Sequence, residues 1–583
     1  MFSRYYQSEI AYLREMGRAF GEANPRVAGL LAERGGDPDV ERLLEGFAFL
    51  TARVRERMDN AVPEIVEGLT ELLLPHYLRT VPAASIVEFS PPLRALRGRS
   101  RVPAGTELAT NPVEGTRCVF RTTFDLDLIP VAVQETTLDQ SVSSAPVLKA
   151  SFTTTEQGRL EVFQPQGLRL FIHAEPAVGG LLLLWVARYC RGIQVRSPEG
   201  QRVWLPPSSI HLSGLDPSCP LLPWPKLAPP GFRLLQEYFT LPQKMLFFDV
   251  RGLEAAAEQI QGERFDLHFE LERPPPLPSR LNNDAFRVHC VPVVNLFNGT
   301  ADPIVHRPLE DEHLVRVAGV DLRHAEVFSV DQVTGVRPGR ANRRTFQPFL
   351  DFSHAAPGTE EPAFYRLRRT LSPIDDWVDT YLSIGTPADV VQQELTEETL
   401  SMELTCTNRS LPTRLQVGDV CAATASSPTI AKFRNIVAVT RPLRPPLGAE
   451  LQWRLLAHLS LNQRSLLDAE ALQSLLEIYN FQAGADEPTA RANQLRAESI
   501  RGVDSQPCTR FLQGAPVRGR QVRVDASESG YAGVGDAFLM GAVLDELFAT
   551  HVTLNAFAEL TLRLQPSQLE FRWPPRSGWR TIS

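Results

Sequence analysis

Histidine and cysteine side chains that could hold a metal occur in one stretch of this 583-residue sequence. His289 and Cys290 precede His306 and His313, and imidazole and thiolate are common zinc ligands. Successive side chains of a strand point to opposite faces, so His289 and Cys290 would not converge on one ion. Ordinary packing is therefore the better interpretation, and no metal site is predicted.

Three aspartates form a second group with chemical potential. Asp375, Asp376 and Asp379 lie close together, and paired carboxylates carry out glycoside cleavage. Adjacent acids that follow Ser372 and Pro373 more often begin a helix, where they accept bonds from free backbone N–H groups. A β-rich carbohydrate-active enzyme stays a distant alternative, and its test is hydrolytic activity that is lost on Asp375→Asn.

A glycine cluster is the third group. Gly530, Gly533, Gly535 and Gly541 resemble a phosphate-binding turn, but the third glycine of the dinucleotide spacing is missing. No strand clearly precedes the cluster either. We predict that these glycines form a loop, without a cofactor.

Other common catalytic signatures are missing from the sequence. Lysine occurs only at positions 149, 226, 244 and 432, none preceded by glycine, which excludes a Gly-Lys-Ser/Thr phosphate loop. None of the eleven histidines is followed by glutamate, and no two cysteines stand at zinc-ribbon spacing. No Gly-x-Ser-x-Gly elbow occurs. We therefore predict no catalytic residue and no cofactor, and expect a protein that is not an enzyme.

Composition indicates a globular cytoplasmic protein. The formal net charge is −8, which gives no electrostatic reason to expect nucleic acid as a partner. The seven cysteines are odd in number and scattered, unlike a secreted disulfide framework. Residues 1–6 open no apolar run, so no signal peptide is expected, and the apolar stretch 181–190 is too short to insert in a membrane.

The elements that must position any functional residue begin with helices, over a predicted region 1–82. Apolar spacing predicts a first helix from about Tyr6 that ends at Asn24-Pro25, a second from Pro38 and a third from Pro63 to Leu74. The apolar face of the second helix is Val40, Leu43, Leu44, Phe47, Leu50, Val54 and Met58.

After Pro82 the apolar period changes to two. Residues 120–128 and 264–271 alternate as half-buried strands do, with a weaker case at 168–172. The proline run 274–278 cannot join a sheet interior and marks a boundary. Helical spacing returns at 455–467, 469–479 and 538–549, followed by a strand at 560–564. These patterns predict a multidomain α+β fold with an N-terminal helical region, β-rich domains at 83–273 and 279–440, and a mixed α/β C-terminal domain at 441–583.

The second helix carries the candidate functional surface. We expect five of its residues to be structurally essential, through burial within the subunit or through a helical bundle shared with partner chains: Leu43, Leu44, Phe47, Leu50 and Val54. The sequence leaves both interpretations open.

Several short blocks, in order along almost the whole chain, resemble the TssF family of type VI secretion baseplate subunits. They include Cys406-Thr407-Asn408-Arg409 and His458-Leu459-Ser460-Leu461-Asn462, which favour this family over a baseplate protein of a phage or other contractile injection device. The remaining blocks lie at 4–6, 13–16, 37–53, 72–78, 241–248, 291–297 and 552–557. Small departures at Leu241 and Val552 exchange one apolar residue for another.

The resemblance implies a role that composition alone does not show. TssF subunits are similar to the wedge proteins of contractile phage baseplates. Two copies are expected to join one TssG, with TssK linking wedges to the membrane complex, TssE initiating the sheath, and six wedges around the VgrG spike. The implied mechanism is a rearrangement of interfaces that triggers sheath contraction, at the cytoplasmic face of the inner membrane complex. The family implies no catalytic or cofactor residues.

Overall fold

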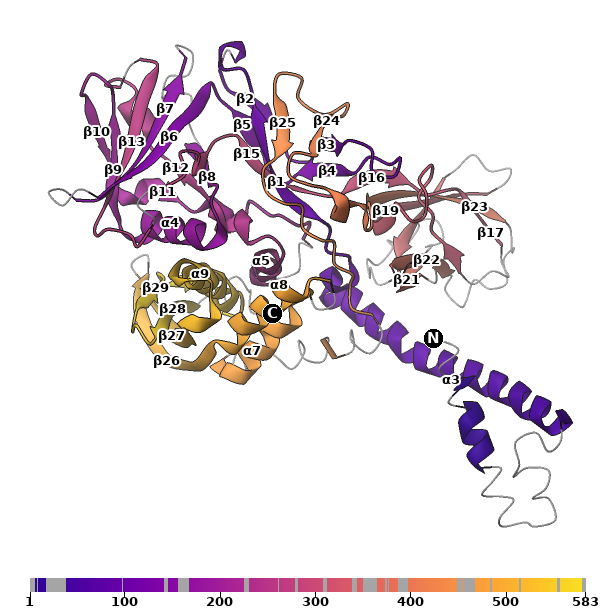
Figure 1. Cartoon of the computed structure of the whole chain (residues 1–583). Coiled ribbons are helices and arrows are strands. Elements are labelled where there is room, and N and C mark those ends of the chain that lie inside the picture. The colour runs from indigo at the N-terminus through magenta and orange to yellow at the C-terminus, as the bar shows by residue number, and fades with distance from the viewer. Residues whose placement is uncertain are drawn as a thin grey trace. The chain divides into compact units, whose positions relative to one another are not determined.

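The chain folds into two compact units in the computed structural model (Figure 1). The first contains Met1–Leu78 and Pro446–Leu456, and the second contains Arg79–Pro445 and Ala457–Ser583. The structure describes the chain except for residues 1–5, 8, 17–37, 97, 141–144, 156–166, 225–229, 261, 278–280, 308–311, 338–342, 350–363, 373–374, 376, 386–396, 448–452, 455–466, 483–484, 513–514, 553–555 and 579–583. The side chains of residues 38, 40, 41, 53–66, 72, 93, 385 and 512 also lie outside the description.

One long helix dominates the first unit. Residues 6–7 and 9–16 are helical, then α3 runs over Pro38–Leu73 and the short 3-10 helix η1 over Pro75–Leu78. The predicted start at Pro38 and stop at Pro75 are confirmed. The predicted break at Pro63 is wrong, because α3 continues through it. An internal proline removes one hydrogen bond and costs about 3 kcal/mol, which the other turns of a 36-residue helix offset.

A six-stranded sheet joins distant parts of the sequence in the second unit. Its central strands β1 and β15 are buried along nearly their whole length, as a sheet covered on both faces requires. In order, the sheet contains β24 (Val420–Ala423), β3 (Glu107–Thr110), β4 (Val119–Thr122), β15 (Cys290–Val294), β1 (Ala84–Ser90) and β25 (Lys432–Asn435).

Two further sheets of the second unit consist of strands between residues 131 and 287. The five-stranded sheet contains β10 (Arg202–Leu205), β9 (Cys190–Arg196), β13 (Arg264–Leu271), β7 (Val147–Thr154) and β6 (Val131–Asp139). The four-stranded sheet contains β11 (Ile210–His211), β12 (Phe247–Val250), β8 (Leu168–Ile172) and β14 (Phe286–Arg287). The strands predicted at 264–271 and 168–172 are confirmed, and burial alternates along β13 as its sequence does.

The strand predicted over 120–128 is instead two strands in different sheets. β4 ends at Thr122, and β5 (Leu126–Leu128) pairs with β2 (Ser100–Val102). Asp125 explains the break, because its carboxylate accepts a bond from the Ala104 N–H at 2.8 Å and pairs with Arg101. The alternation of buried and half-buried side chains continues through the bend, which is why the pattern looked like one strand.

An eight-stranded sheet forms the region labelled β16, β17, β19, β21, β22 and β23 in Figure 1. Its core includes Val333, Leu382, Leu400, Met402 and Leu404. Its strands are β16 (Phe297–Thr300), β23 (Glu398–Thr407), β19 (Glu326–Val336), β20 (Arg344–Pro348), β21 (Phe364–Leu371), β22 (Val378–Gly385), β18 (His313–Leu314) and, beside β23, β17 (Ile304–His306).

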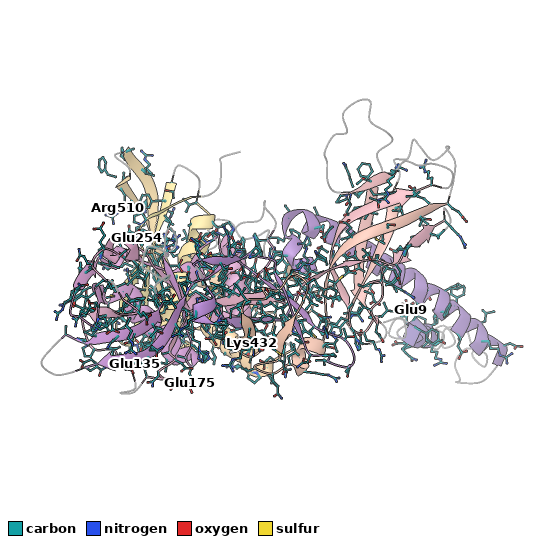
Figure 2. The ribbon with its side chains drawn as sticks, turned by 90° about the horizontal axis from the view of Figure 1, so that it is seen from above. Glu9, Glu135, Glu175, Glu254, Lys432 and Arg510 are labelled. Carbon is teal, nitrogen blue, oxygen red and sulfur yellow. The ribbon has the colours of Figure 1, made fainter. Side chains whose placement is uncertain are left out.

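The C-terminal part of the second unit packs helices on a five-stranded sheet. The sheet contains β26 (Ile500–Leu512), β27 (Ala515–Ser527), β28 (Ala556–Gln565), β29 (Glu570–Arg572) and β30 (Arg576–Ser577). Arg510 lies on the β26–β27 hairpin (Figure 2). The helices are α7 (Ala469–Ile478), α8 (Glu487–Glu498) and α9 (Val534–Thr550), and α9 also packs against α4 (Pro176–Arg188) and α5 (Pro230–Thr240).

The glycine cluster corrects two sequence predictions. Gly530 and Gly533 precede α9, but Gly535 and Gly541 lie inside it, so the loop prediction is wrong for this pair. The helix predicted from Phe538 therefore begins earlier. A Cβ on Gly535 would lie 2.2 Å from the backbone carbon of Gly180, so glycine lets α9 approach α4 closely. The predicted helix at 469–479 and strand at 560–564 are confirmed, whereas the helix predicted at 455–467 lies almost wholly outside the described residues.

Candidate partner interface

Three residues of the predicted apolar face of α3 are exposed to solvent in the isolated chain. Leu43, Phe47 and Leu50 are 70%, 58% and 62% exposed, and Leu44 is half-buried. At about 100° per residue, the three exposed residues lie within roughly 60° of one another on the helix surface. Val54 falls on the same stripe by its spacing, although its side chain lies outside the description. We call Leu43, Phe47, Leu50 and Val54 the α3 stripe.

The opposite side of α3 is packed. Ala48 and Ala52 are completely buried, and they lie about 150° around the helix from the α3 stripe. Small residues one turn apart allow close approach of another element. The helix therefore already has a packed face, and the α3 stripe is a second apolar face. Its spacing of four, three and four residues is that of a coiled-coil seam.

The first helix shows the same excess of apolar surface. Ile10 is buried, whereas Tyr12 and Met16 are 57% and 50% exposed. Isolated exposed apolar residues are common, but groups of them on neighbouring helices mark interaction sites.

A second feature joins the six-stranded and eight-stranded sheets. Asn295 and Asn408 bind each other: the Asn295 side-chain amide donates to the Asn408 side-chain oxygen at 2.8 Å, and the Asn408 backbone N–H donates back at 2.8 Å. Asn408 also accepts from the Val119 N–H in β4 at 3.1 Å. The turn after β23 is thus fixed to both sheets, by residues of two blocks that carry the family resemblance.

Arg409, the next residue, binds two of the three aspartates that the sequence analysis considered as catalytic. Its guanidinium donates to Asp375 at 2.8 Å and to Asp379 at 2.7 Å, and its side chain is 3% exposed. Both carboxylates therefore bind one structural cation. This is unlike a glycosidase pair, whose carboxylates flank an open sugar site. Asp376, the third aspartate of the prediction, lies outside the described residues.

The histidine and cysteine group does not converge on one point. His289 is buried, its ring accepts from the Ile129 N–H at 3.2 Å, and burial lowers its pKa to about 4. Burial also raises the pKa of the Cys290 thiol well above its usual value, so the thiolate that a metal needs is disfavoured. His306 and His313 contact each other at 2.9 Å. Among the described residues, no three metal-ligating side chains come together.

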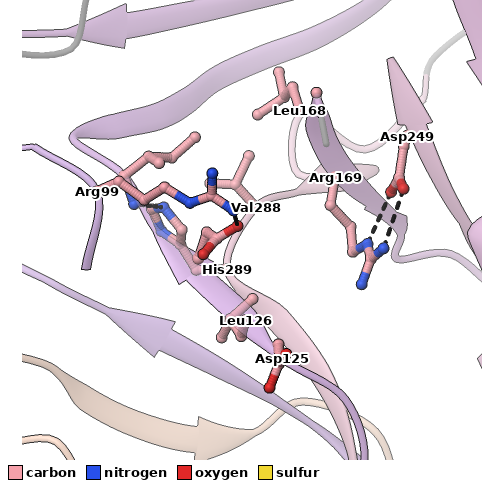
Figure 3. Close-up of a pocket in the computed structure, with 11 residues that line it drawn as sticks. Arg99, Asp125, Leu126, Leu168, Arg169, Asp249, Val288 and His289 are labelled. Atoms are coloured by element: carbon pink, nitrogen blue, oxygen red, sulfur yellow. Dashed lines mark hydrogen bonds and ion pairs between the residues drawn. The ribbon is translucent and has the colours of Figure 1, made fainter. Parts of the chain in front are cut away.

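Two pockets lie beside His289: an open cleft of about 330 Å³ and a smaller cavity (Figure 3). Arg99, Arg169 and Asp249 line the smaller cavity, with Arg169 and Asp249 paired at 2.8 Å. Its volume of about 30 Å³ admits a water molecule or two, far less than the several hundred Å³ of a small-molecule site. A sugar substrate does not fit there. The helices that the structure describes include none long and apolar enough to cross a membrane.

Comparison with known proteins gives one consistent result. The family model of the type VI secretion system protein TssF matches residues 1–580. The chain is 31% identical to the type VI secretion system component TssF1 of Pseudomonas aeruginosa, over 99% of this chain and 98% of that protein. This chain belongs to the TssF family. It is a baseplate component of a type VI secretion system, as its sequence resemblance implied.

Solved structures of type VI baseplate complexes extend the match to the fold. A chain of a TssK–TssF–TssG baseplate subcomplex superposes with a TM-score of 0.78 at 33% identity, covering 93% of this chain and all of that one. A chain of a type VI baseplate complex gives a TM-score of 0.64 at 28% identity, with complete coverage of both. The multidomain α+β prediction is confirmed.

This chain also contains a buried ion pair that the sequence analysis did not predict. Lys244 and Glu237 are both fully buried and bind at 2.7 Å, while Glu237 also accepts from the Leu221 N–H at 2.7 Å. Two features of the sequence could have pointed to Lys244: lysine is rare in this chain, and Lys244 lies in the block at 241–248 that resembles the TssF family. Nothing in the sequence around Glu237, which lies in α5, pointed to its role in the pair.

Proposed function

We propose that this TssF chain is a structural wedge subunit whose α3 stripe joins a helical bundle with partner chains. The observation that carries the proposal is the exposure of Leu43, Phe47 and Leu50 on a helix whose other face is already packed. A partner helix packed on the α3 stripe would bury its apolar side chains. Burial stabilises the complex by about 25 cal/mol for each Å² of apolar surface removed from water. The supported role is mechanical rather than catalytic.

The partners of this chain follow from its relatives. Relatives of known structure are assembled with TssK and TssG, which supports the same partners here. We further propose two copies of this chain per TssG, contact with TssE, and six wedges around the VgrG spike. The wedges would dock at the cytoplasmic face of the inner membrane complex, where baseplate rearrangement would trigger sheath contraction.

Phe47→Asp tests the α3 stripe. A carboxylate in the bundle seam would be buried without a partner, which costs several kcal/mol. We expect the variant to lose co-purification with TssG. Because Phe47 is 58% exposed, the isolated variant should fold normally, and circular dichroism and gel filtration check this.

Phe49→Asp is the matched control. Phe49 is 46% exposed on the same helix but lies away from the α3 stripe, about 200° around the helix from Phe47. This variant should still recover the complex. Normal co-purification of Phe47→Asp, or equal loss in both variants, would contradict the assignment of this face.

A further inference from the structure

A small polar cavity lies inside the eight-stranded sheet region, close to the junction with the six-stranded sheet. Its volume is about 10 Å³, the space that one buried water molecule needs. Glu326 at the start of β19, Thr380 in β22 and Arg409 after β23 line it, together with apolar side chains such as Val317 and Val327. The three strands β19, β22 and β23 belong to one sheet (Figure 1).

Each of these three residues has a buried polar atom that no described group satisfies. The atoms are Glu326 Oε2, Thr380 Oγ1 and Arg409 Nε. The rest of each residue is well bound: the Thr80 hydroxyl donates to Glu326 Oε1, the Thr380 carbonyl accepts from the Val315 N–H, and Arg409 binds its two aspartates. Leaving a buried polar atom without a partner is costly, and three such atoms on residues that line one cavity point to a shared partner.

The atom types restrict what the partner can be. Arg409 Nε–H only donates, so the occupant must accept a hydrogen bond, which excludes a metal cation or an ammonium ion. Three carboxylates, Glu326, Asp375 and Asp379, surround Arg409, so an anion is disfavoured as well. The occupant must be neutral, must both donate and accept, and must fit the volume of one water.

We propose that this cavity is a specific site for one water molecule, which accepts from Arg409 Nε and bridges Glu326 Oε2 to Thr380 Oγ1. The water links Glu326 indirectly to the guanidinium that already binds Asp375 and Asp379. It thereby connects β19, β22 and the turn after β23. The water can donate to Glu326 when the carboxyl group is ionised and accept from it when it is protonated.

Thr380→Val tests the site, because the rate of amide exchange in β22 should change in opposite directions for a hydrated and a dry cavity. Valine keeps the shape of threonine but removes the hydroxyl. If water binds there, the variant loses a hydrogen bond, and we expect amide exchange in β22 of the full-length chain to become about 3–10-fold faster. If the cavity is dry, removal of an unpaired hydroxyl is neutral or stabilising, so exchange in β22 would be unchanged or slower, and the proposal would be overturned.

Two further measurements complete the test. Thr370→Val, on the neighbouring strand β21, removes a hydroxyl that bonds its own strand at an exposed position and should leave exchange in β22 unchanged. A structure of the full-length chain at about 1.8 Å should show a peak within hydrogen-bond distance of Glu326 Oε2, Thr380 Oγ1 and Arg409 Nε. A cavity without density at that resolution would also overturn the proposal.

Discussion

At the scale of residues, one guanidinium binds two aspartates beside the junction of the six-stranded and eight-stranded sheets. Arg409 adopts a left-handed backbone conformation, with φ of 48°, directly after Asn408. This turn aims the Asn408 side chain at the six-stranded sheet and the Arg409 side chain at β22. An unpaired buried charge is far more costly than a paired one, so the two aspartates and Arg409 depend on one another.

Glu326 gives this region a pH dependence. Burial raises its pKa from 4.5 to about 7, so the folded chain holds a proton that the unfolded chain releases between about pH 4.5 and 7. The stability that Glu326 contributes therefore falls as pH rises through this window. In Glu326→Gln, which does not titrate, we expect the free energy of unfolding relative to the parent to rise by up to about 3 kcal/mol between pH 4.5 and 7.

Urea unfolding of parent and variant across that pH range checks this prediction. Glu397→Gln, which removes the charge of a 60% exposed carboxylate, is the control for the loss of one surface charge. A constant difference between Glu326→Gln and the parent would show that Glu326 titrates normally in the folded chain.

At the scale of elements, the contact of α4 with α9 depends on two glycines. In Gly535→Ala the new methyl group would meet the Gly180 backbone at 2.2 Å, and neither helix can shift without disturbing the α9 core. We expect a loss of at least about 2 kcal/mol in the free energy of unfolding. Trp573, one of seven tryptophans, stacks on Phe538 of α9, so tryptophan fluorescence during urea unfolding includes a signal from this region.

Gly46→Ala in α3 is the matched control for this substitution. No atom lies within 4 Å of its added methyl group, and alanine favours a helix over glycine by about 1 kcal/mol. This variant should be as stable as the parent or more so. Equal stability of Gly535→Ala and the parent would mean that α4 and α9 do not approach as closely as the structure shows.

The elements also show which features a sequence reveals. Burial alternates in β13 because one face packs and the other does not, so its period of two predicted the strand from end to end. The bend at Asp125 depends on one side-chain bond to a backbone N–H 21 positions away, which local spacing does not record. The passage of α3 through Pro63 depends on the length of the helix, because its other turns offset the hydrogen bond that proline removes.

The candidate site divides in the same way. The α3 stripe was predictable, because its residues repeat along one helix. The Asn295–Asn408 pair spans 113 positions. Glu326 and Thr380 come from two different strands, and Arg409 comes from the turn after a third. No periodicity connects such residues. Their convergence became visible only when the sheets were assembled.

At the scale of the whole molecule, the chain contains one unit built mainly of sheets and a helical unit that exposes apolar side chains. The sheets draw strands from distant parts of the sequence, and buried polar networks fix the junction between two of them. Such a body suits the transmission of force, and an exposed helical seam suits assembly. Together they support the wedge role within the baseplate.

The mass of the complex formed on co-expression with TssG from the same gene cluster tests this central claim most directly. Native mass spectrometry of the purified assembly should give two copies of this 64.9 kDa chain per TssG. A soluble monomer that ignores TssG would contradict the wedge assembly.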